Sequence, residues 1–488
     1  MKAALSPCPN CRRLEAEVAE LRAQLRLALQ RIARLEEQNR LLQGENRQLR
    51  ERTQQLEAEL RRGKRQAAPF SKERPRQPPK RPGRKPGQGH FHFQQPPPEA
   101  EIEETVRVPL PQCPRCGGCV RERRAHEHFQ VDLPEIRPRW RRFVSESGYC
   151  AHCRCRVHVR PPEQLSGATG AAGVSVGPRA KALAADLKHR LGVPWRKITD
   201  LFSVAFGVKV TASALYQADA RLAARLDGVY TELAQMLRQA AQVHADETGW
   251  RIGLLPCWLW VVANAEVSVY AISDRSHPVV LQVLGREFKG VLTSDCFTAY
   301  DARALGEWVQ QKCLAPLIRA ASELDEQKTR GAVRFPRAVA ALFREALALA
   351  KQRPQLEAAL FAGRRAELEA RRDRLIDPRR HFTDPDNARL AKRLRKQRRH
   401  LLTFLSDAYP ALEATNNRAE RMLRPAVITR KTGGCNRSRS GARTHAVRAS
   451  VLVSLRQQGR DLLGYLSAAL LAPGRPPPLS AAPAAATP

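Results

Sequence analysis

The stretch His244–Ile252 reads HADETGWRI and decides the fold. It leaves an alanine-rich helical pattern and runs into PCWLWVVANA, residues 256–265. Trp, Val, Tyr and Ile at this density favour β-strands. Two adjacent acids, Asp246 and Glu247, therefore stand in the most strand-like region of a chain whose formal net charge is +36. Their position in so basic a chain needs a chemical reason.

The segments after this stretch predict the order of a sheet. VSVYAISD (267–274) is a third strand, SHPVVLQVLGREF (276–288) a helix with Ser276 as its cap, and GVLTSDCFTAY (290–300) a fourth strand. WVQQKCLAPLI (308–318) is a fifth candidate strand. Three strands, a helix and a further strand are the ribonuclease H pattern, in which three antiparallel strands are followed by a crossover to a parallel fourth strand beside the first. We expect an α+β multidomain chain with a ribonuclease H-like (α/β) catalytic core.

Three acidic side chains are the candidate catalytic residues. Asp246 in the first strand and Asp295 at the end of the fourth would face each other, and TNNRAERMLRP places Glu420 on a helix capped by Thr415 or Asn416. Carboxylate oxygens suit hard cations, so this set could hold two Mg²⁺ (or Mn²⁺) ions that clamp both oxygens of a phosphodiester exchange. A single acid in a charged chain is usually a solvated surface group, and only the joint pattern favours a site.

Glu247 competes with Asp246 as a metal ligand. Successive strand residues point to opposite faces, so only one of the two can join the other acids. We prefer Asp246, because its short side chain at a strand end is better fixed.

The charge balance predicts the partner. Lys and Arg number 84 against 48 Asp and Glu, so the surface attracts polyanions. Double-stranded DNA is the expected partner rather than an anionic membrane, because no amphipathic anchor or long apolar run is present. The N-terminus has no secretory signal pattern, which favours a reducing, cytoplasmic, nucleoid-associated location and no disulfides. The candidate DNA-binding residues are Arg196, Lys197, Arg421, Arg424, Arg430 and Lys431.

The first 100 residues predict self-association and a tether. Over 14–60, leucine recurs every seven residues except for Ala28, which favours a parallel two-stranded coiled coil over 1–62 and a homodimer or higher oligomer. A single amphipathic helix packed on its own protein is the alternative. Residues 63–100 form a basic, Pro-rich linker that is either a solvated tether or a contact to the DNA backbone.

A zinc-ribbon-like module is predicted over residues 101–165. Two CxxC pairs, each able to place two thiolates on one turn, supply the ligands of a structural Zn²⁺. These ligands are Cys113, Cys116, Cys150 and Cys153, with Cys119, Cys155, His126, His128 and His152 nearby as possible substitutes. Free thiols in a small β unit are the alternative.

The remaining boundaries follow from helical patterns and composition. Residues 175–230 read as a helical DNA-binding region resembling a helix-turn-helix, with turns at Gly192 and Gly207 and Thr211 as a cap. Helical packing is an equal alternative for this region. The catalytic domain covers 241–320 and 413–460, around a basic helical insertion at 321–412, and residues 461–488 read as a disordered tail.

Several ordered motifs together resemble the DDE transposases of the IS66 family of bacterial insertion sequences. They are HADETGWRI, WLWVV, GVLTSDCFTAY, TNNRAERMLRP, ITRKTGG and SGARTHA. The resemblance implies a triad of Asp246, Asp295 and Glu420, binding to terminal inverted repeats, nicking that exposes 3′-hydroxyls, strand transfer into target DNA, and accessory transposition proteins. The family usually has a His where this chain has Pro316, which cannot contact a phosphate or donate a backbone hydrogen bond.

Two other functions fit part of this pattern. A DNA-binding regulatory protein would keep the basic modules around an idle ribonuclease H-like domain. A ribonuclease H-like nuclease would cut DNA without joining it.

Overall fold

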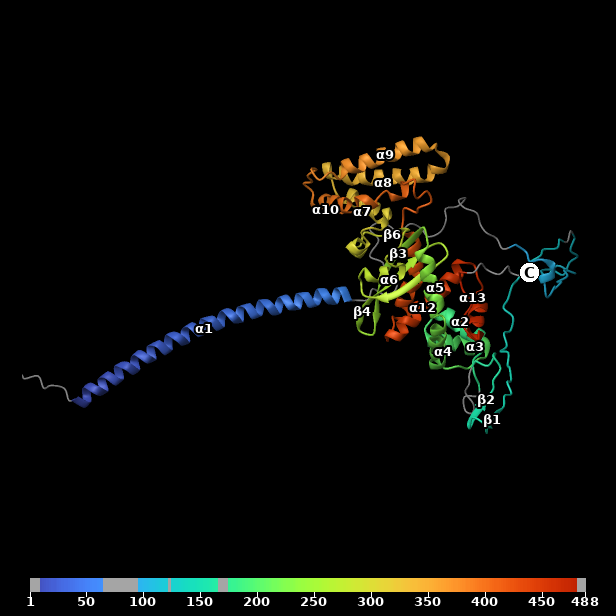
Figure 1. The fold of residues 1–488 in the computed structure, drawn as a ribbon, viewed down its shortest axis with the longest axis horizontal. Coiled ribbons are helices and arrows are strands. Elements are labelled where there is room, and N and C mark those ends of the chain that lie inside the picture. The colour runs from blue at the N-terminus through green and yellow to red at the C-terminus, as the bar shows by residue number, and fades with distance from the viewer. Residues whose placement is uncertain (1–8, 65–94, 122–123, 166–173, 481–488) are drawn as a thin grey trace, which may run out of the picture. The chain divides into compact units, whose positions relative to one another are not determined.

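The computed structural model describes residues 9–64, 95–121, 124–165 and 174–480, and the chain divides into compact units at residues 1–94 and 95–488. The described part of the first unit is one helix, α1 (Pro9–Lys64), shown in Figure 1. Its apolar heptad side chains, such as Leu21 and Leu35, are exposed. A lone helix cannot form a coiled coil, so self-association stays a prediction. Most of the predicted linker, residues 65–94, lies outside the described residues.

The cysteine-rich segment contains short local structures. After η1 (Glu99–Glu101), a turn is closed by the hydrogen bond from Gly117 N to Cys113 O (2.8 Å). Strands β1 (Ser147–Cys150) and β2 (Cys155–His158) then form an antiparallel hairpin, in which Cys150 lies opposite Cys155. Each CxxC pair therefore lies at a tight turn, as the spacing predicts.

A five-stranded mixed sheet organises the second unit. Its strands are β3 (Gln242–Ile252), β4 (Leu255–Ala263), β5 (Ser268–Ser273), β6 (Val291–Ser294) and β7 (Val309–Lys312), in the order β5-β4-β3-β6-β7. The first three are antiparallel, while β6 runs parallel to β3 and β7 parallel to β6. The predicted adjacency of the first and fourth strands is confirmed.

The fifth predicted strand is correct only in its first half. It ends at Lys312, and α7 (Leu314–Gln327) begins where the prediction continues the strand. Pro316 lies in the first turn of α7, where a backbone N–H has no partner within the helix, so proline is tolerated there. The residue that departs from the family pattern thus fits its local structure.

Helices cover both faces of the sheet. On one face, α5 (Asp227–Arg238) and α6 (Pro278–Leu284) share a core with Ala245 and Trp260. On the other face, α11 (Asn417–Gly433) packs against Leu259 and Val261. The predicted cap Ser276 does not cap α6, because its hydroxyl donates to Asp274 instead (2.8 Å).

Helix α12 (Arg439–Gln457) covers the β5 edge of the sheet. The Ser450 hydroxyl accepts a hydrogen bond from Tyr270 N (2.8 Å), and the Ser454 hydroxyl accepts one from Ser268 N (3.0 Å). These serines satisfy backbone groups that an edge strand would otherwise leave open to another chain.

The predicted turns of the helical region 175–230 are confirmed, but the region is not a separate unit. Gly207 ends α3 (Trp195–Phe206) in the left-handed conformation (φ 62°), and Thr211 caps α4 (Ala212–Arg225). However, Leu222 of α4 and residues of α2 (Pro178–His189) are buried in the same core as the sheet. Helical periodicity reveals an apolar face but not the surface that covers it, which is why the sequence suggested a separate region.

The prediction of a disordered tail over 461–488 is wrong for its described part. Helix α13 (Leu462–Leu471) begins at the cap Asp461 and buries Leu466 in the main core. Leu479 is only 2% exposed, and Ser480 N donates to Glu232 Oε1 (2.6 Å). The apolar run LLGYLSAALL carries enough surface to fold, which the composition of the Pro- and Ala-rich end concealed. Residues 481–488 lie outside the described ranges.

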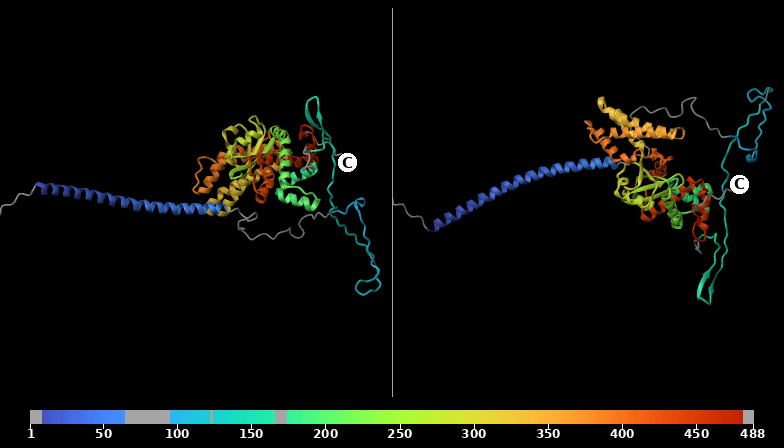
Figure 2. Two further views of the ribbon diagram at one scale, coloured as in Figure 1. Left: turned by 90° about the horizontal axis from the view of Figure 1, so that it is seen from below. Right: turned by 45° about the horizontal axis from the view of Figure 1, so that its top comes forward.

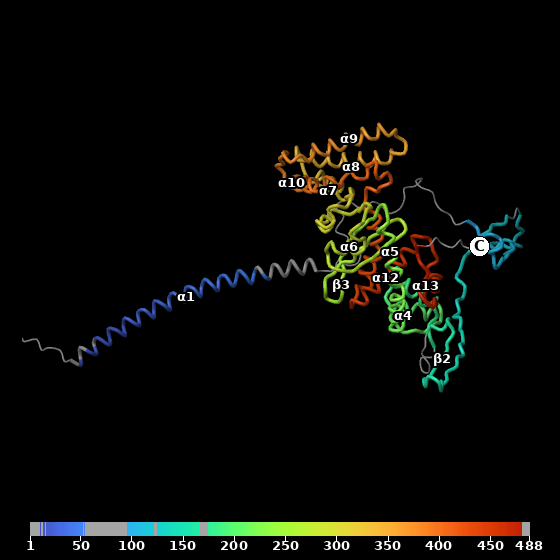
Figure 3. The backbone as a smooth tube through the Cα atoms, viewed as in Figure 1, coloured from blue at the N-terminus to red at the C-terminus, as the bar shows by residue number. Residues whose placement is uncertain are grey.

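The insertion forms its own core between β7 and α11. It contains α7, α8 (Arg334–Gln352), α9 (Ala358–Leu375) and α10 (Pro385–Lys396), whose backbone Figures 2 and 3 show in yellow to orange. These helices bury residues such as Phe343 and Leu394. Two short 3₁₀ turns, η2 (Thr298–Asp301) and η3 (Arg303–Leu305), lie between β6 and β7, whereas η4 (Arg330–Val333), η5 (Arg353–Gln355), η6 (Arg398–His400) and η7 (Thr403–Leu405) lie in the insertion. Across the described ranges, no helix combines the length and apolar character needed to cross a bilayer.

Candidate active site

Asp246 of β3 lies level with Asp295, the first residue after the neighbouring parallel strand β6. The register pairs His244 of β3 with Thr293 of β6, so two residues further on Asp246 stands beside Asp295. Asp295 follows the last residue of β6, and its Oδ1 accepts a hydrogen bond from Phe297 N (2.9 Å), which fixes the turn. The sheet itself therefore brings together two acids that are far apart in sequence.

Glu420 is the third acid, in the first turn of α11. Its side chain is exposed, and α11 packs on the sheet face to which Asp246 points, since Val261, the partner of Asp246 on β4, contacts that helix. A carboxylate is favourable at a helix N-terminus because of the helix dipole. In the part of the chain that the structure describes, neither Asp295 nor Glu420 pairs with a basic side chain.

The pKa of Asp246 is raised by burial and partly also because the other acids lie near it. This pKa is raised to about 7 in total, chiefly by burial and also by the charges of Glu247, Asp295 and Glu420, against one lowering hydrogen bond from Glu247 N (2.9 Å). Perturbed carboxyl groups of this kind cluster at functional sites. However, the described residues contain no group of three His, Cys, Asp or Glu side chains gathered closely enough to hold a metal ion. The three acids interact electrostatically without forming a preassembled ligand set.

Asn416 attaches the start of α11 to the strand that carries Asp246. It is the N-cap residue, one of the two predicted, but its side chain makes no capping bond. Instead its Nδ2 donates to the carbonyl oxygen of Ala245 (2.8 Å), and its backbone N donates to the Cys313 sulfur (3.1 Å). The first turn of α11 is thereby held one residue from Asp246.

Arg430 and Asn436 form hydrogen bonds to the C-terminal half of β3. The Arg430 guanidinium donates to the carbonyl oxygen of Gly249 and to the Thr248 hydroxyl (3.1 Å). Asn436 accepts from Trp250 Nε1 (2.8 Å) through its side chain. Arg430 was a candidate DNA contact, and the structure places its half-buried guanidinium between α11 and the strand, where it is bonded to the protein.

The other candidate DNA contacts remain on the surface. Arg196 and Lys197 are exposed in the first turn of α3, while Arg421, Arg424 and Lys431 are exposed on α11. The latter three share their helix with Glu420.

Glu247 is directed to the opposite face from Asp246. Its side chain is 2% exposed, accepts a hydrogen bond from the Tyr300 hydroxyl (2.8 Å) and pairs with Arg275 (2.9 Å). The Arg275 guanidinium lies 3.9 Å from the Trp258 ring centre and 3.8 Å from that of Phe297. Glu247 thus has partners that satisfy its charge, which favours Asp246 as the functional acid.

Sequence reasoning missed Lys312, a fully buried cation beside the site. Its Nζ lies 3.1 Å from Asp301 Oδ1 and 3.3 Å from the Ser294 hydroxyl. Burial lowers the pKa of Lys312, while Asp301 and more distant Asp295 favour its charged form. Asp301 also pairs with Lys396 of α10 (2.8 Å), so this cluster joins the insertion to the sheet. The only sign of this buried lysine in the sequence is the polar end of the strand VQQK.

The predicted zinc ligands are only partly brought together. Cys150 lies opposite Cys155 in the hairpin, and the sulfur atoms of Cys153 and Cys155 are 2.9 Å apart. Backbone N–H groups of Arg115 and Cys116 lower the pKa of Cys113, as suits a thiolate ligand. Because no group of three ligands is gathered in the described residues, the alternatives Cys119, His126, His128 and His152 stay open.

We predict that Asp246→Asn stabilises the metal-free protein at neutral pH. A folded-state pKa raised from 3.8 to about 7 makes the ionised carboxylate unfavourable, so stability falls as pH rises from about 4 to about 7. A shift of this size corresponds to about 4 kcal/mol in full, which partial solvation reduces to about 2 kcal/mol. Urea unfolding at pH 5 and pH 8 with a chelator measures the effect. If the variant is no more stable than the parent at pH 8, the ionised Asp246 carboxylate does not destabilise the folded protein.

A family model described as transposase IS66 family matches residues 173–444, more than half of the chain. The match runs from the start of the helical region into α12 and includes Asp246, Asp295 and Glu420. A comparison with curated proteins finds no match.

Proposed function

The chain belongs to the IS66 family of transposases, and on this basis we propose that it binds the terminal inverted repeats of an insertion sequence, cuts them and transfers the cut strands to target DNA. The observation that carries the proposal is the acidic site. Asp246 on β3 stands level with Asp295 at the end of the adjacent strand β6, and the charge of Glu420 contributes to the raised pKa of Asp246. Three acids from three elements are what a DDE triad requires.

The sheet supports a ribonuclease H-like catalytic core. Its order, with three antiparallel strands and then two parallel ones beside the first, is the order expected for that fold. The core at 314–414 then corresponds to an insertion between the second and third acids. Such an insertion lengthens the chain between Asp295 and Glu420 without disturbing the sheet.

The donor set fits Mg²⁺ or Mn²⁺. We assign Asp246, Asp295 and Glu420 as the ligands of two ions, because carboxylate oxygens are the ligands these hard cations prefer. When bound, the ions would supply charge stabilisation for the attacking and leaving oxygens. Without a bound cation the three carboxylates repel one another. This repulsion explains why their charges affect the pKa of Asp246 although the side chains are not close enough together to form a metal site.

The chain's own groups hold this site and approach its substrate. Asn416 and Arg430 fix α11 against β3, so they set the separation between Glu420 and Asp246. Exposed Arg421, Arg424 and Lys431 on α11 are placed to contact phosphates beside the acids. Arg196 and Lys197 provide a second basic surface on α3.

The accessory modules complete the proposal. We assign structural Zn²⁺ to Cys113, Cys116, Cys150 and Cys153, with Cys155 as a further candidate because it lies against Cys153. The exposed apolar seam of α1 supports a homodimer or higher oligomer. The partners are then element and target DNA and, by family resemblance, accessory transposition proteins, with the protein acting at the nucleoid in the cytoplasm.

The experiment that tests the function supplies labelled DNA with the element's ends, a plasmid target and Mg²⁺. We expect cut ends and products joined to the plasmid. Cutting without joined products would indicate a nuclease, and binding without cutting would indicate a regulatory protein with an idle site. Omitting the plasmid provides the control for joining.

A further inference from the structure

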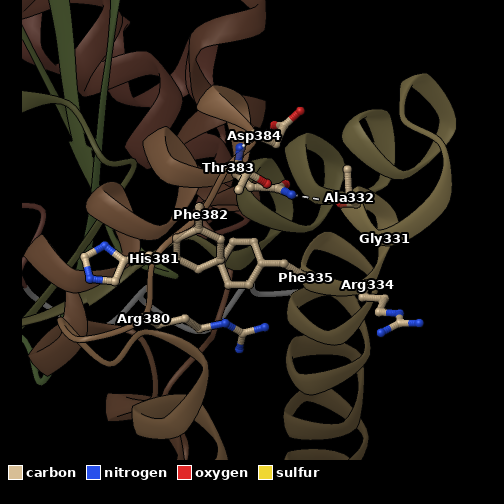
Figure 4. A pocket seen from close by; sticks show the side chains of 10 residues that line it. Gly331, Ala332, Arg334, Phe335, Arg380, His381, Phe382, Thr383 and Asp384 are labelled. Atoms are coloured by element: carbon tan, nitrogen blue, oxygen red, sulfur yellow. Dashed lines mark hydrogen bonds between the residues drawn. The ribbon is translucent and has the colours of Figure 1, made fainter.

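A small pocket lies within the insertion, away from the acidic site. Its volume is about 190 Å³, and it lies between the start of α8 and the segment that leads into α10 (Figure 4). Ligand pockets for drug-sized molecules are about 300–1,000 Å³, so this one suits a single ring system. Its lining combines aromatic, cationic and polar side chains, and the chemistry proposed at the three acids uses none of them.

Phe335 and Phe382 form the aromatic wall. Their ring centres are 4.5 Å apart at an interplanar angle of 57°, and Phe335 is only 3% exposed. Phe382 is half-buried. The Arg380 guanidinium lies 5.5 Å from the first ring centre and 5.3 Å from the second. Aromatic faces beside a guanidinium are the surfaces on which unpaired bases stack.

The mouth of the pocket is positively charged. Arg334, Arg380 and His381 are exposed, and none pairs with a carboxylate in the described part of the chain. The carboxylate among the lining residues, Asp384, is held by Lys328 (2.8 Å) and caps α10. An entering anion therefore meets guanidinium groups that no carboxylate of the described residues neutralises, while the lining carboxylate of Asp384 is already paired with Lys328.

Asn387 leaves a hydrogen-bond acceptor open at this pocket. Its side chain is buried, 4% exposed, and its Nδ2 donates to the carbonyl oxygen of Ala332 (2.8 Å). That bond fixes the orientation of the amide, and Oδ1 has no partner among the described residues. A buried acceptor without a donor is unfavourable, so a ligand bringing an N–H group would be stabilised. Nucleobases carry such donors on their edges.

We propose that this pocket binds one unpaired nucleotide of single-stranded DNA. The base packs against Phe382, and Arg334 and Arg380 bind its phosphate. A paired base is excluded, because its faces are stacked and its edge is occupied in the duplex. This inference rests on the proposed function for its ligand, DNA, and adds a site specific for strand ends that are no longer paired.

The test compares two DNA probes on full-length protein that carries Asp246→Asn, so that cutting does not interfere. One fluorescent duplex is blunt, and the other has the same duplex with a single-stranded overhang. We expect Phe382→Leu to weaken binding of the overhang probe about tenfold and to leave the blunt probe unchanged. Arg380→Ala should weaken overhang binding by a similar factor. Arg374→Ala, at an exposed arginine of α9, is the matched control and should change binding less than about twofold.

Three outcomes decide the proposal. Selective loss on the overhang probe supports it. Wild-type-like binding by both variants overturns it, and so does an equal loss on both probes, which would indicate contact with duplex phosphates only. Arg380 is exposed, so Arg380→Ala remains informative if Phe382→Leu unfolds. Because binding is measured without catalysis, failure of strand joining in the wild-type protein would leave this result intact.

Discussion

Substituting Glu420 with Gln is expected to lower DNA cleavage and joining by about 10²–10³-fold while leaving DNA binding intact. The change keeps the size of the side chain and removes one negative charge from the set that includes Asp246 and Asp295. Preorganised charge in an active site typically contributes this much to a rate. Glu420 is the most informative of the three acids, because it is exposed and comes from a helix rather than the sheet.

The measurement is the initial rate of cleavage of labelled element ends in Mg²⁺, beside a binding assay on the same DNA. Glu287→Gln is the matched control, since it removes one charge from an exposed acid in the loop after α6. We expect its rate to stay within about twofold of wild type, as is usual for surface positions remote from a site. If Glu420→Gln behaves like this control, α11 does not supply the third acid and the triad is wrongly assigned.

The two strand acids could be predicted from the sequence because they depend on local signals. Dense β-branched and aromatic residues define β3 and β4, and the side-chain alternation of a strand separates Asp246 from Glu247. The order of elements then specifies that β6 pairs with β3, which brings Asp295 level with Asp246. Each step follows from periodicity or from topology.

The supporting residues could not be predicted, because they depend on which surfaces meet. Arg430 reads as one more arginine in a basic segment, yet it donates to Gly249 across the interface between α11 and the sheet. Lys312 reads as a polar strand end, yet it is fully buried against Asp301. A charge is expected in solvent unless its partner is known, and sequence alone does not identify that partner.

The same limit explains the errors on either side of the sheet in the sequence, in the helical region before it and in the C-terminal segment. Helical periodicity predicts the apolar faces of α2 and α4. It does not predict that these faces pack into the core beside the sheet. At the C-terminus, the composition of the last residues outweighed the apolar run of α13. In both cases the sequence does not identify the surface on which the helix packs, which belongs partly to α12.

A buried ionic network joins these helices to the sheet. Asp219 of α4 accepts hydrogen bonds from His189 Nε2 of α2 (2.6 Å) and from Arg448 Nε of α12 (3.0 Å). His189 contacts His445 (3.0 Å between Nδ1 atoms), and the His445 ring stacks on Trp250 of β3 at 5.3 Å. Arg448 is fully buried, and its terminal nitrogens have no partner among the described residues. Its charge depends on Asp219.

Asp219→Asn is therefore expected to destabilise the protein by about 3–5 kcal/mol, the usual effect of leaving a buried charge unpaired. Burial raises the pKa of Asp219, but the charges of His189 and Arg448 outweigh it and hold this pKa below its ordinary value, so the carboxylate is ionised at neutral pH. A lowered folded-state pKa stabilises the protein above the unfolded value of 3.8 and loses that contribution as pH falls below it. Urea unfolding at pH 7.5, followed by tryptophan fluorescence, measures the effect.

The controls separate the buried charge from any Asp-to-Asn change. Asp227→Asn breaks an exposed ion pair with Arg443, whose side chains are 53% and 49% exposed, and should cost at most about 1 kcal/mol. Adding Arg448→Met to Asp219→Asn removes the orphaned cation and should restore part of the lost stability. Asp219→Asn could instead lower the free energy of unfolding no more than Asp227→Asn does. In that case another group neutralises Arg448, and apolar packing alone holds these helices against β3.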